Sequence, residues 1–213
     1  AGVTSFGGGV GAFSASGTIK NNIFRFCSGG LGAGIYAQTS SIVVENNVFT
    51  RNQTLAGGGT ASISGGTPVF RNNTFYANEI PFGQEGVDLY AVGGDFTFER
   101  NIVADGLGGV GVFCQGSQDA VVECNIVWNA EFGAFGGTCV DALGTSGNIA
   151  ADPLLCDPPS FDFGVCLDSP ALNGPCGSIG YVSPEGNCPV CSPTPVSASV
   201  ETSSWGRVKA RYR

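Results

Sequence analysis

The stretch Glu45-Asn46-Asn47-Val48-Phe49 decides the fold, because the same phrase returns along the chain at nearly constant intervals. It follows Lys20-Asn21-Asn22-Ile23-Phe24 and precedes Arg71-Asn72-Asn73-Thr74-Phe75. Weaker copies come later, so that the second asparagine of the phrase stands at Asn22, Asn47, Asn73, Asn101, Asn125 and Asn148. The steps between these positions are 25, 26, 28, 24 and 23 residues. A period of this length is the signature of a solenoid.

Aligning the copies on this asparagine gives columns of uniform chemical character. The residue three places before it is apolar, as in Ile19, Val44, Phe70, Phe98 and Val122. The next residue is charged, as in Lys20, Glu45, Arg71, Glu99 and Glu123. This alternation predicts a strand with one buried face, and the β-branched and aromatic residues after the asparagine predict a second strand. We expect a third strand at 34–36, 62–64, 88–90 and 111–113.

Three short strands in each repeat predict a triangular coil, and we expect about six coils stacked as parallel strands. The asparagine should lie at a corner with left-handed backbone angles, its amide bonded to the asparagine of the next coil. Helical repeats are excluded because 35 glycines and 11 prolines would interrupt helices throughout. A β-propeller needs longer repeats, and a leucine-rich repeat needs a leucine lattice that this chain lacks.

These repeats resemble those of right-handed parallel β-helix proteins of the pectate-lyase-like superfamily, in particular secreted right-handed β-helix repeat proteins of bacteria. A second resemblance lies in Asp152-Pro153-Leu154, Asp162-Phe163 and Asp168-Ser169-Pro170-Ala171-Leu172, which are similar to the closing segment of many such proteins. The resemblance implies an all-β, right-handed parallel β-helix over about residues 7–180. It implies no single activity, because the group contains enzymes, binding proteins and structural proteins.

The composition indicates an oxidising, extracellular setting. Charged residues make up only 12% of the 213 residues, and the formal net charge is −8. An acidic chain is a poor nucleic-acid partner, and no apolar stretch is long enough to cross a membrane. We therefore predict a secreted, extracellular or cell-surface protein.

Nine cysteines, most of them late in the chain, predict a disulfide-rich C-terminal cap. We expect Cys114 to pair with Cys124 or Cys139, Cys156 with Cys166, and Cys176 with Cys188 or Cys191. The odd number leaves Cys27 as the expected free thiol. The spacing of Cys188-Pro189-Val190-Cys191 also suits a metal site, but zinc would need further ligands and the chain has no histidine.

The sequence divides into coils at 1–150, a Cys-rich cap at 151–191, and a Pro-rich linker with a basic tail at 192–213. The chain opens with a phrase that resembles the middle of a later repeat, so we expect it to start inside a coil. Either upstream coils have been removed, or another surface covers this end. Four of the nine basic residues lie in the last seven positions. The tail residues that we expect to dock on another surface are Val196, Val200, Trp205, Arg207, Arg211 and Tyr212.

The resemblance directs the search for an active site to the outer faces of the coils, where related lyases and hydrolases carry clusters of carboxylates. On the outer face of the third strand we expect Tyr36, Asp88, Tyr90 and Phe113, which offer three aromatic rings to a sugar and one carboxylate. The neighbouring Glu99 and Glu123 are a weak candidate calcium site, and we expect no other cofactor. A lone carboxylate without histidine does not favour an enzyme.

The function that the sequence favours is a secreted, non-catalytic structural or adhesive solenoid. We expect its partner to be a second copy, joined head to tail into filaments through residues 1–10 at one end and the cap and tail at the other. The alternative is an extracellular polysaccharide-binding or polysaccharide-lyase-like protein.

Overall fold

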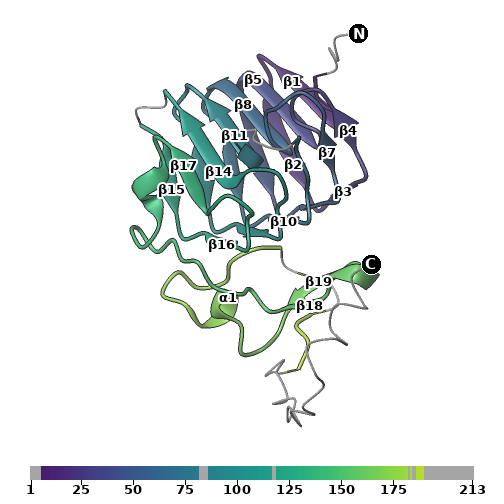
Figure 1. The fold of residues 1–213 in the computed structure, drawn as a ribbon, viewed down its shortest axis with the longest axis vertical. Coiled ribbons are helices and arrows are strands. Elements are labelled where there is room, and N and C mark those ends of the chain that lie inside the picture. The colour runs from purple at the N-terminus through teal and green to yellow at the C-terminus, as the bar shows by residue number, and fades with distance from the viewer. Residues whose placement is uncertain (1–5, 82–85, 117–118, 182, 184–185, 190–213) are drawn as a thin grey trace, which may run out of the picture.

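In a computed structural model of the protein, the chain winds into a solenoid of short parallel β-strands (Figure 1). The structure describes residues 6–81, 86–116, 119–181, 183 and 186–189. Each turn of the chain contributes one strand to each of three parallel sheets, so residues about 25 positions apart lie side by side. This is the arrangement that the repeat predicts.

The first sheet contains β1 (Val10–Phe13), β5 (Ile35–Glu45), β8 (Ala61–Gly66), β11 (Gly86–Val92), β14 (Val110–Gln115) and β17 (Phe135–Gly137). The long strand β5 continues into the second sheet, which also contains β2 (Ser16–Lys20), β9 (Val69–Arg71), β12 (Thr97–Glu99) and β15 (Val121–Glu123). The third sheet contains β3 (Ile23–Arg25), β6 (Val48–Thr50), β10 (Thr74–Tyr76), β13 (Ile102–Ala104) and β16 (Ile126–Trp128).

Few elements lie outside these sheets. The strands β4 (Ser28–Gly29) and β7 (Gln53–Thr54) form a small parallel pair on the side of the first coils. After the last coil come η1 (Val140–Ala142), β18 (Leu155–Asp157), η2 (Pro158–Ser160), β19 (Asp162–Val165) and the short helix α1 (Pro170–Asn173). Among the described residues, no helix has the length and hydropathy that a membrane crossing needs.

The solenoid makes about five turns rather than the six expected. The third sheet has five strands, and the sixth asparagine, Asn148, is followed only by a single bridge between Ile126 and Ile149. The chain then leaves the solenoid. The sixth copy of the phrase is thus a closing corner rather than a full coil.

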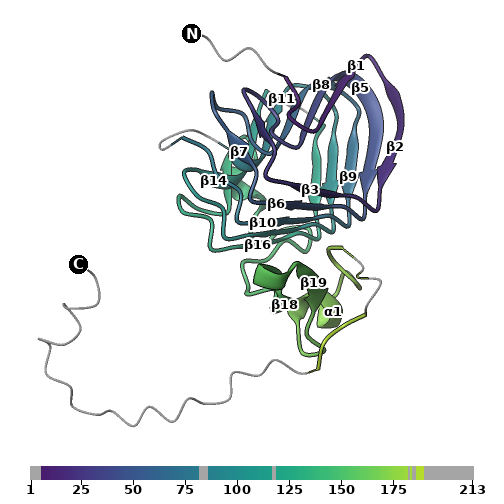
Figure 2. The same ribbon diagram turned by 90° about the vertical axis from the view of Figure 1, so that its right-hand side faces the viewer.

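The three sheets enclose an interior, as the turned view in Figure 2 shows, and stacked aromatic rings fill it. Phe24, Phe49 and Phe75 hold equivalent places on β3, β6 and β10. The ring centroids of Phe24 and Phe49 are 4.8 Å apart and those of Phe49 and Phe75 are 4.6 Å apart, with nearly parallel planes. Later coils place Val103 and Val127 in this column, and Phe98 of the second sheet fills part of the space.

The left-handed backbone at the corner belongs to the residue before the ladder asparagine, which corrects the sequence-based expectation. In the first five corners these residues have φ between 51° and 58° and are Asn21, Asn46, Asn72, Arg100 and Cys124, and in the sixth the residue is Gly147, with φ of 77°. A left-handed residue turns the chain, and the next asparagine can then point inward. This explains why the first position of the phrase tolerates Arg and Cys whereas the second does not vary.

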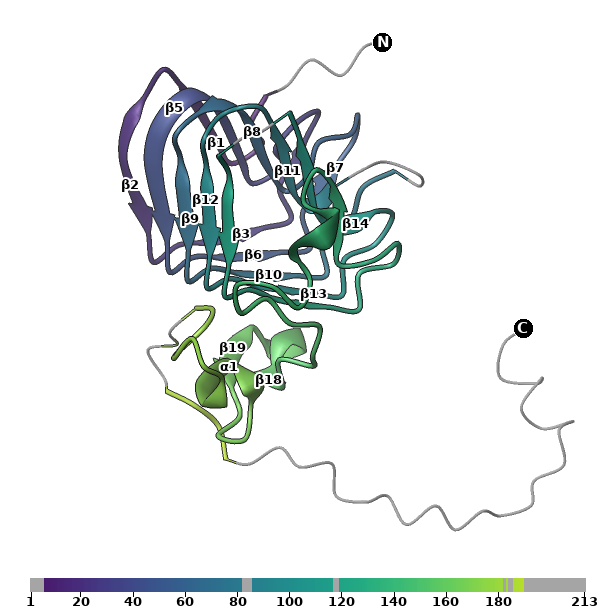
Figure 3. The ribbon, with the colours of Figure 1, turned by 90° about the vertical axis from the view of Figure 1, so that its left-hand side faces the viewer.

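The described residues of the segment 151–189 lie along the outer face of the third sheet and do not lie across the end of the solenoid as a cap would (Figure 3). Val165, Ala171 and Ile179 pack against Ile102 and Ile126 of that sheet. Backbone bonds fix the contact, since Gly180 donates to the Arg100 carbonyl at 2.8 Å and the Tyr181 amide donates to Thr74 Oγ1 at 3.0 Å. The end of the last coil is instead covered by the turn that contains η1, where Cys139 and Ala142 join the core.

Candidate functional site

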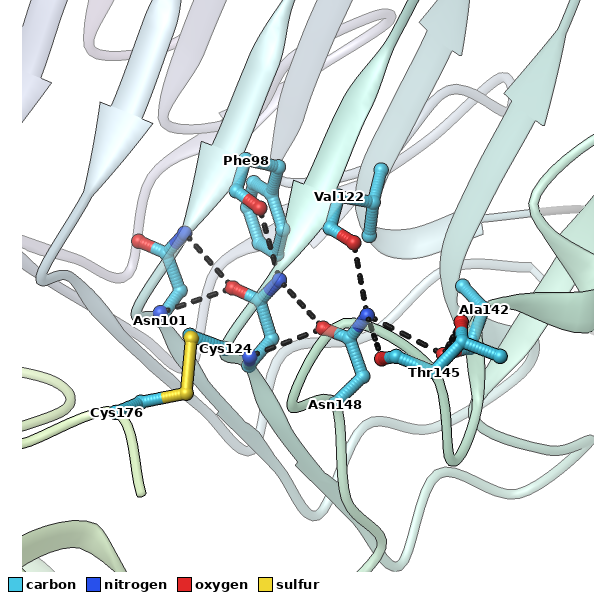
Figure 4. The surroundings of a disulfide bond; sticks show 9 residues. Phe98, Asn101, Val122, Cys124, Ala142, Thr145, Asn148 and Cys176 are labelled. Atoms are coloured by element: carbon cyan, nitrogen blue, oxygen red, sulfur yellow. Dashed lines mark hydrogen bonds between the residues drawn. A yellow bond between two sulfur atoms is a disulfide. The ribbon is translucent and has the colours of Figure 1, made fainter. Parts of the chain in front are cut away.

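The six asparagines form one continuous ladder through the solenoid, and Figure 4 shows its last part, from Asn101 to Asn148. In each step the backbone and side-chain nitrogens of one asparagine donate to Oδ1 of the asparagine in the next coil, at 2.9–3.2 Å. The side-chain nitrogen also donates to a strand carbonyl, as from Asn73 to Val44 at 2.9 Å. All members except Asn22 are fully buried. The ladder is structural, because its buried side-chain amides are used to hold the corners.

A second, shorter ladder lies five residues after the ladder asparagine in two successive coils, and we did not predict it. The amide nitrogens of Asn52 donate to Asn78 Oδ1 at 3.0 Å, and the backbone of Cys27 donates to Asn52 Oδ1 at 2.9 Å. In the next coil the equivalent position is Gly106, which has no side chain to continue the ladder. The signal in the sequence was an asparagine five places after the ladder asparagine in two successive repeats.

Asp88 closes this second ladder from another strand. Its Oδ1 accepts from Asn78 Nδ2 at 2.7 Å, and it takes the place that an asparagine at 106 would fill. A Cβ at Gly106 would lie 2.8 Å from Asp88 Oδ2 and 2.6 Å from Val87 Cγ1. The absence of a side chain at 106 therefore makes room for Asp88.

Asp88 does not face outward, which corrects the predicted sugar-facing site. The register between β11 and β14 shifts between Gly86 and Leu89, and this bulge turns Val87, Asp88 and Leu89 all into the interior. Burial raises the pKa of Asp88 to about 7, although the bond from Asn78 lowers it, and the charge of Asp105 adds to the rise. Asp88 Oδ2 has no hydrogen-bond partner among the described residues.

The aromatic residues of the predicted sugar face do share one column, but the column is partly covered. Tyr36, Ser62, Tyr90 and Phe113 occupy paired positions on β5, β8, β11 and β14. Tyr36 is only 5% exposed, since the rings of Phe6 and Phe13 lie 5.0 and 5.6 Å from its own. Tyr90 and Phe113 stack on each other at 5.7 Å and are half-buried. An exposed platform for a sugar therefore does not extend along this face.

The charged column of the second sheet runs in the predicted register. Lys20 pairs with Glu45, Glu45 with Arg71, Arg71 with Glu99, and Glu99 with Glu123. Arg71 and Glu45 form an ion pair of 2.7 Å on the surface. Glu99 and Glu123, the candidate calcium ligands, are register neighbours, and the structure brings no third carboxylate among the described residues to them.

The disulfides differ from most of the expected pairs. Cys114 bonds to Cys139, one of the two partners expected, and ties neighbouring coils. Cys124 bonds to Cys176, and Cys156 bonds to Cys188 rather than to Cys166. The expected pairs assumed a separate cap, whereas the segment 151–189 folds back beside the coils and meets Cys124 there. These bonds indicate an oxidising environment.

The remaining cysteines are distributed as follows. Cys27 is a free, half-buried thiol, and burial raises its pKa. Cys166 Sγ lies 3.2 Å from Cys188 Sγ, so that three cysteine sulfurs of the C-terminal segment lie together. Cys191 lies outside the described residues, as do Val196, Val200, Trp205, Arg207, Arg211 and Tyr212.

Two cavities border the sheets in the described part of the chain. One, of about 430 Å³, lies beside β15 and is closed on its other side by the turn around η1. The other, of about 320 Å³, lies between the third sheet and the segment 151–189, and is lined by Tyr76, Ala104, Asp105, Trp128, Asp152, Pro153, Leu155 and Pro158. We did not predict the second cavity. Its sequence signal was the third residue after the ladder asparagine, which is aromatic in two coils.

Comparison with known proteins identifies the family. Neither the search of curated proteins nor the search of solved structures gave a significant match. The family described as "Right handed beta helix region" matches residues 3–152, which is more than half of the chain and contains all the coils. The chain therefore belongs to the right-handed β-helix family.

Proposed function

We propose that this protein is a secreted, non-catalytic structural or adhesive solenoid that associates head to tail with further copies of itself. The observation that carries the proposal is the pair of free edges at the two ends of the second sheet. In the described chain, β2 pairs only with β5, and β15 pairs only with β12. Free edges of a parallel sheet present unpaired backbone groups that another strand can join.

The charged column makes the two edges complementary. It begins with Lys20 on β2 and ends with two neighbouring glutamates, of which Glu123 stands on β15. If β2 of a second copy continued the sheet next to β15 in the same register, Lys20 would face Glu123. Glu123, whose described neighbour in the column is Glu99, would then gain a cation on its other side.

The two ends also differ in the way that head-to-tail contact requires. At the first end the ladder amide Asn22 is exposed, Phe13 and Phe26 are more than half exposed, and Phe24 and Ile19 are only half-buried. At the other end the turn around η1 covers the first sheet, and a cavity separates this turn from β15. A contact between unlike ends repeats without closing, and so it produces filaments.

A charge exchange tests this contact. We expect Lys20→Glu and Glu123→Lys each to weaken association at least tenfold, because each places like charges across the interface. The double variant should restore it. Association is measured by light scattering across a concentration series and by negative-stain electron microscopy, with circular dichroism as the check on folding.

Each outcome decides between arrangements. Filaments of the unaltered protein that dissociate in both single variants and return in the double variant support head-to-tail contact. Association lost in Lys20→Glu alone would show that two first ends meet and would overturn the head-to-tail arrangement. An unaltered protein that stays a single rod at all concentrations would overturn self-association itself.

The alternative, polysaccharide binding, has weaker support. The aromatic column that suggested it contains Tyr36, which other rings cover, and the carboxylate expected beside it points inward. The stacked rings of Tyr90 and Phe113 favour it, because both residues are only half-buried.

A further inference from the structure

The cavity between the third sheet and the segment 151–189 has two aromatic walls. Tyr76, Ala104 and Trp128 occupy paired positions on β10, β13 and β16, so they follow one another across the sheet. The small side chain of Ala104 leaves a gap between the two larger ones. Because neighbouring strands are about 4.8 Å apart, the backbones that carry the rings are about 10 Å apart. A flat or compact group can enter between them.

Two carboxylates stand at the same cavity, and both are held in place. Asp105 Oδ1 accepts from Asn129 Nδ2 at 2.7 Å. Burial and the neighbouring Asp105 carboxylate raise the pKa of Tyr76. Asp152 Oδ1 accepts from the Leu154 amide at 2.9 Å. Asp152 and Trp128 are exposed at the cavity, and the Trp128 indole nitrogen makes no hydrogen bond within the described residues.

The chemistry of this lining suits a cation. Aromatic faces attract ammonium and guanidinium groups, and carboxylates pair with them. No described residue that lines the cavity is basic. In the first two coils the same surface does receive cations, because Arg25 and Arg51 stack over Phe161 at 5.0 and 5.2 Å. The equivalent positions beside the cavity hold Tyr76, Ala104 and Trp128, with Asp105 next to them. These positions offer two aromatic rings and a carboxylate instead of a cation.

A disulfide holds the residue Cys188, which precedes the basic C-terminal tail, next to the wall of this cavity. Leu155 and Pro158 line the cavity, and Cys156 between them is bonded to Cys188. The described chain ends one residue later, at Pro189, and 24 residues follow. They include Arg207, Lys209, Arg211 and Arg213. The eighteen residues after Pro189, up to Arg207, can span up to about 60 Å, so the basic residues can reach the cavity. The same tether keeps their effective concentration at the cavity near the millimolar range.

We propose that the Tyr76–Trp128 cavity is a binding site for an arginine or lysine side chain, and that the basic C-terminal tail of the same chain is its occupant. The tail thereby covers Trp128 and neutralises Asp105 and Asp152. This docking does not depend on head-to-tail association, since it uses the third sheet and not the edges of the second.

Crosslinking of the full chain tests the contact directly. The protein has two lysines, Lys20 and Lys209, and a carbodiimide joins a lysine amine to a carboxylate only when the two are in contact. We expect peptides that join Lys209 to Asp105 or Asp152. Lys20 is the internal control, because its register neighbour is Glu45. A mixture of unlabelled and ¹⁵N-labelled protein shows whether the linked peptides come from one chain.

Exposure of Trp128 gives an independent measurement. In a Trp205→Phe background, Trp128 is the remaining tryptophan. We expect acrylamide to quench its fluorescence at least twofold more strongly when the four basic residues of the tail are replaced by glutamine, or when Asp105→Asn and Asp152→Asn are combined. The exposed pair Asp95→Asn and Asp119→Asn removes the same charge elsewhere and should leave quenching unchanged.

Three results would overturn the proposal. Crosslinks of Lys209 that go mainly to other carboxylates would place the tail elsewhere. Links between differently labelled chains would assign the occupant to a second copy. Trp128 quenching that is the same with and without the basic residues would show that the cavity stays open to solvent.

Discussion

Single asparagine side chains hold the corners of this molecule by satisfying backbone groups that would otherwise be buried without partners. Asn73 is the clearest example. It donates to Asn101 and to the Val44 carbonyl, and it accepts two bonds from Asn47. No other uncharged side chain of this size offers a carbonyl and an amide in one plane, which the ladder requires.

Replacement of Asn73 by alanine should destabilise the protein strongly. We expect Asn73→Ala to lower the free energy of unfolding by about 3 kcal/mol or more, because it leaves several buried groups without partners. The matched control is Asn22→Ala at the exposed end of the ladder, which should cost less than about 1 kcal/mol. Urea denaturation measures both, and equal losses would contradict the view that burial makes the ladder strong.

Asp88 should make stability fall as the pH rises. Its pKa is raised from an ordinary value of 3.8 to about 7 in the folded protein, so the folded state binds the proton more tightly than the unfolded state does. Stability should therefore be highest near pH 4, decrease up to about pH 7, and stay reduced above it. The full effect is on the order of 4 kcal/mol.

Asp88→Asn removes this titration and keeps the acceptor for Asn78. We expect the variant to lose the decrease between pH 4 and 7 and to be more stable than the unaltered protein at pH 8. Denaturation at a series of pH values checks this. Asp119→Asn is the surface control, and a pH profile that Asp88→Asn leaves unaltered would contradict the assignment.

At the scale of elements, the third sheet is the one whose outer face is buried by a later part of the chain. Ile102 and Ile126 lie on that face, and Ile179 and Ala171 cover them. Gly180 makes this approach possible, because a Cβ at that position would lie 2.4 Å from Ile102 Cδ1. The sheet and the C-terminal segment therefore form one packed unit.

Gly180→Ala should detach this contact locally. We expect a loss of about 2–3 kcal/mol, with faster amide hydrogen exchange at Tyr181, which bonds to Thr74. Gly177→Ala is the matched control, because it has a similar positive φ but open space around the new Cβ. If both variants lose equal stability, the cost comes from backbone strain and not from the contact with Ile102.

At the scale of the whole molecule, one covalent bond joins the two parts that the packing brings together. Cys124 stands at a corner of the last full coil and Cys176 in the C-terminal segment, 52 residues apart. Figure 4 places this bond beside the end of the asparagine ladder. The cavity that we assign to the basic tail lies between the same two parts, so its shape depends on their being held together.

Removal of this disulfide should loosen the C-terminal segment before the coils. We expect the double variant Cys124→Ser with Cys176→Ser to lose roughly 4 kcal/mol, as a loop of this length implies. Hydrogen exchange should rise across 151–181 and stay slow in β6, β10 and β13. Cys27→Ser, which removes the free thiol, is the control and should leave both measurements unaltered.

The solenoid, its period and its ladder follow from the amino-acid sequence, because each repeat of about 25 residues contains the strand residues and the corner asparagine of one coil. Equivalent residues of neighbouring coils lie next to one another in the sheets. The apolar, charged and asparagine columns could therefore be assigned from the repeat phrase. The odd number of cysteines, with Cys27 far from the others in the sequence, identified Cys27 as the free thiol.

The features that depart from the repeat follow instead from the tertiary structure. The bulge that turns Asp88 inward depends on Gly106 in the following coil, and a single strand pattern contains no sign of it. The disulfide partners and the Tyr76–Trp128 cavity depend on where the segment 151–189 lies, and that segment has no period. A repeat fixes neighbours one coil away, whereas a segment that returns from the end of the chain is placed by the apolar surface that it covers.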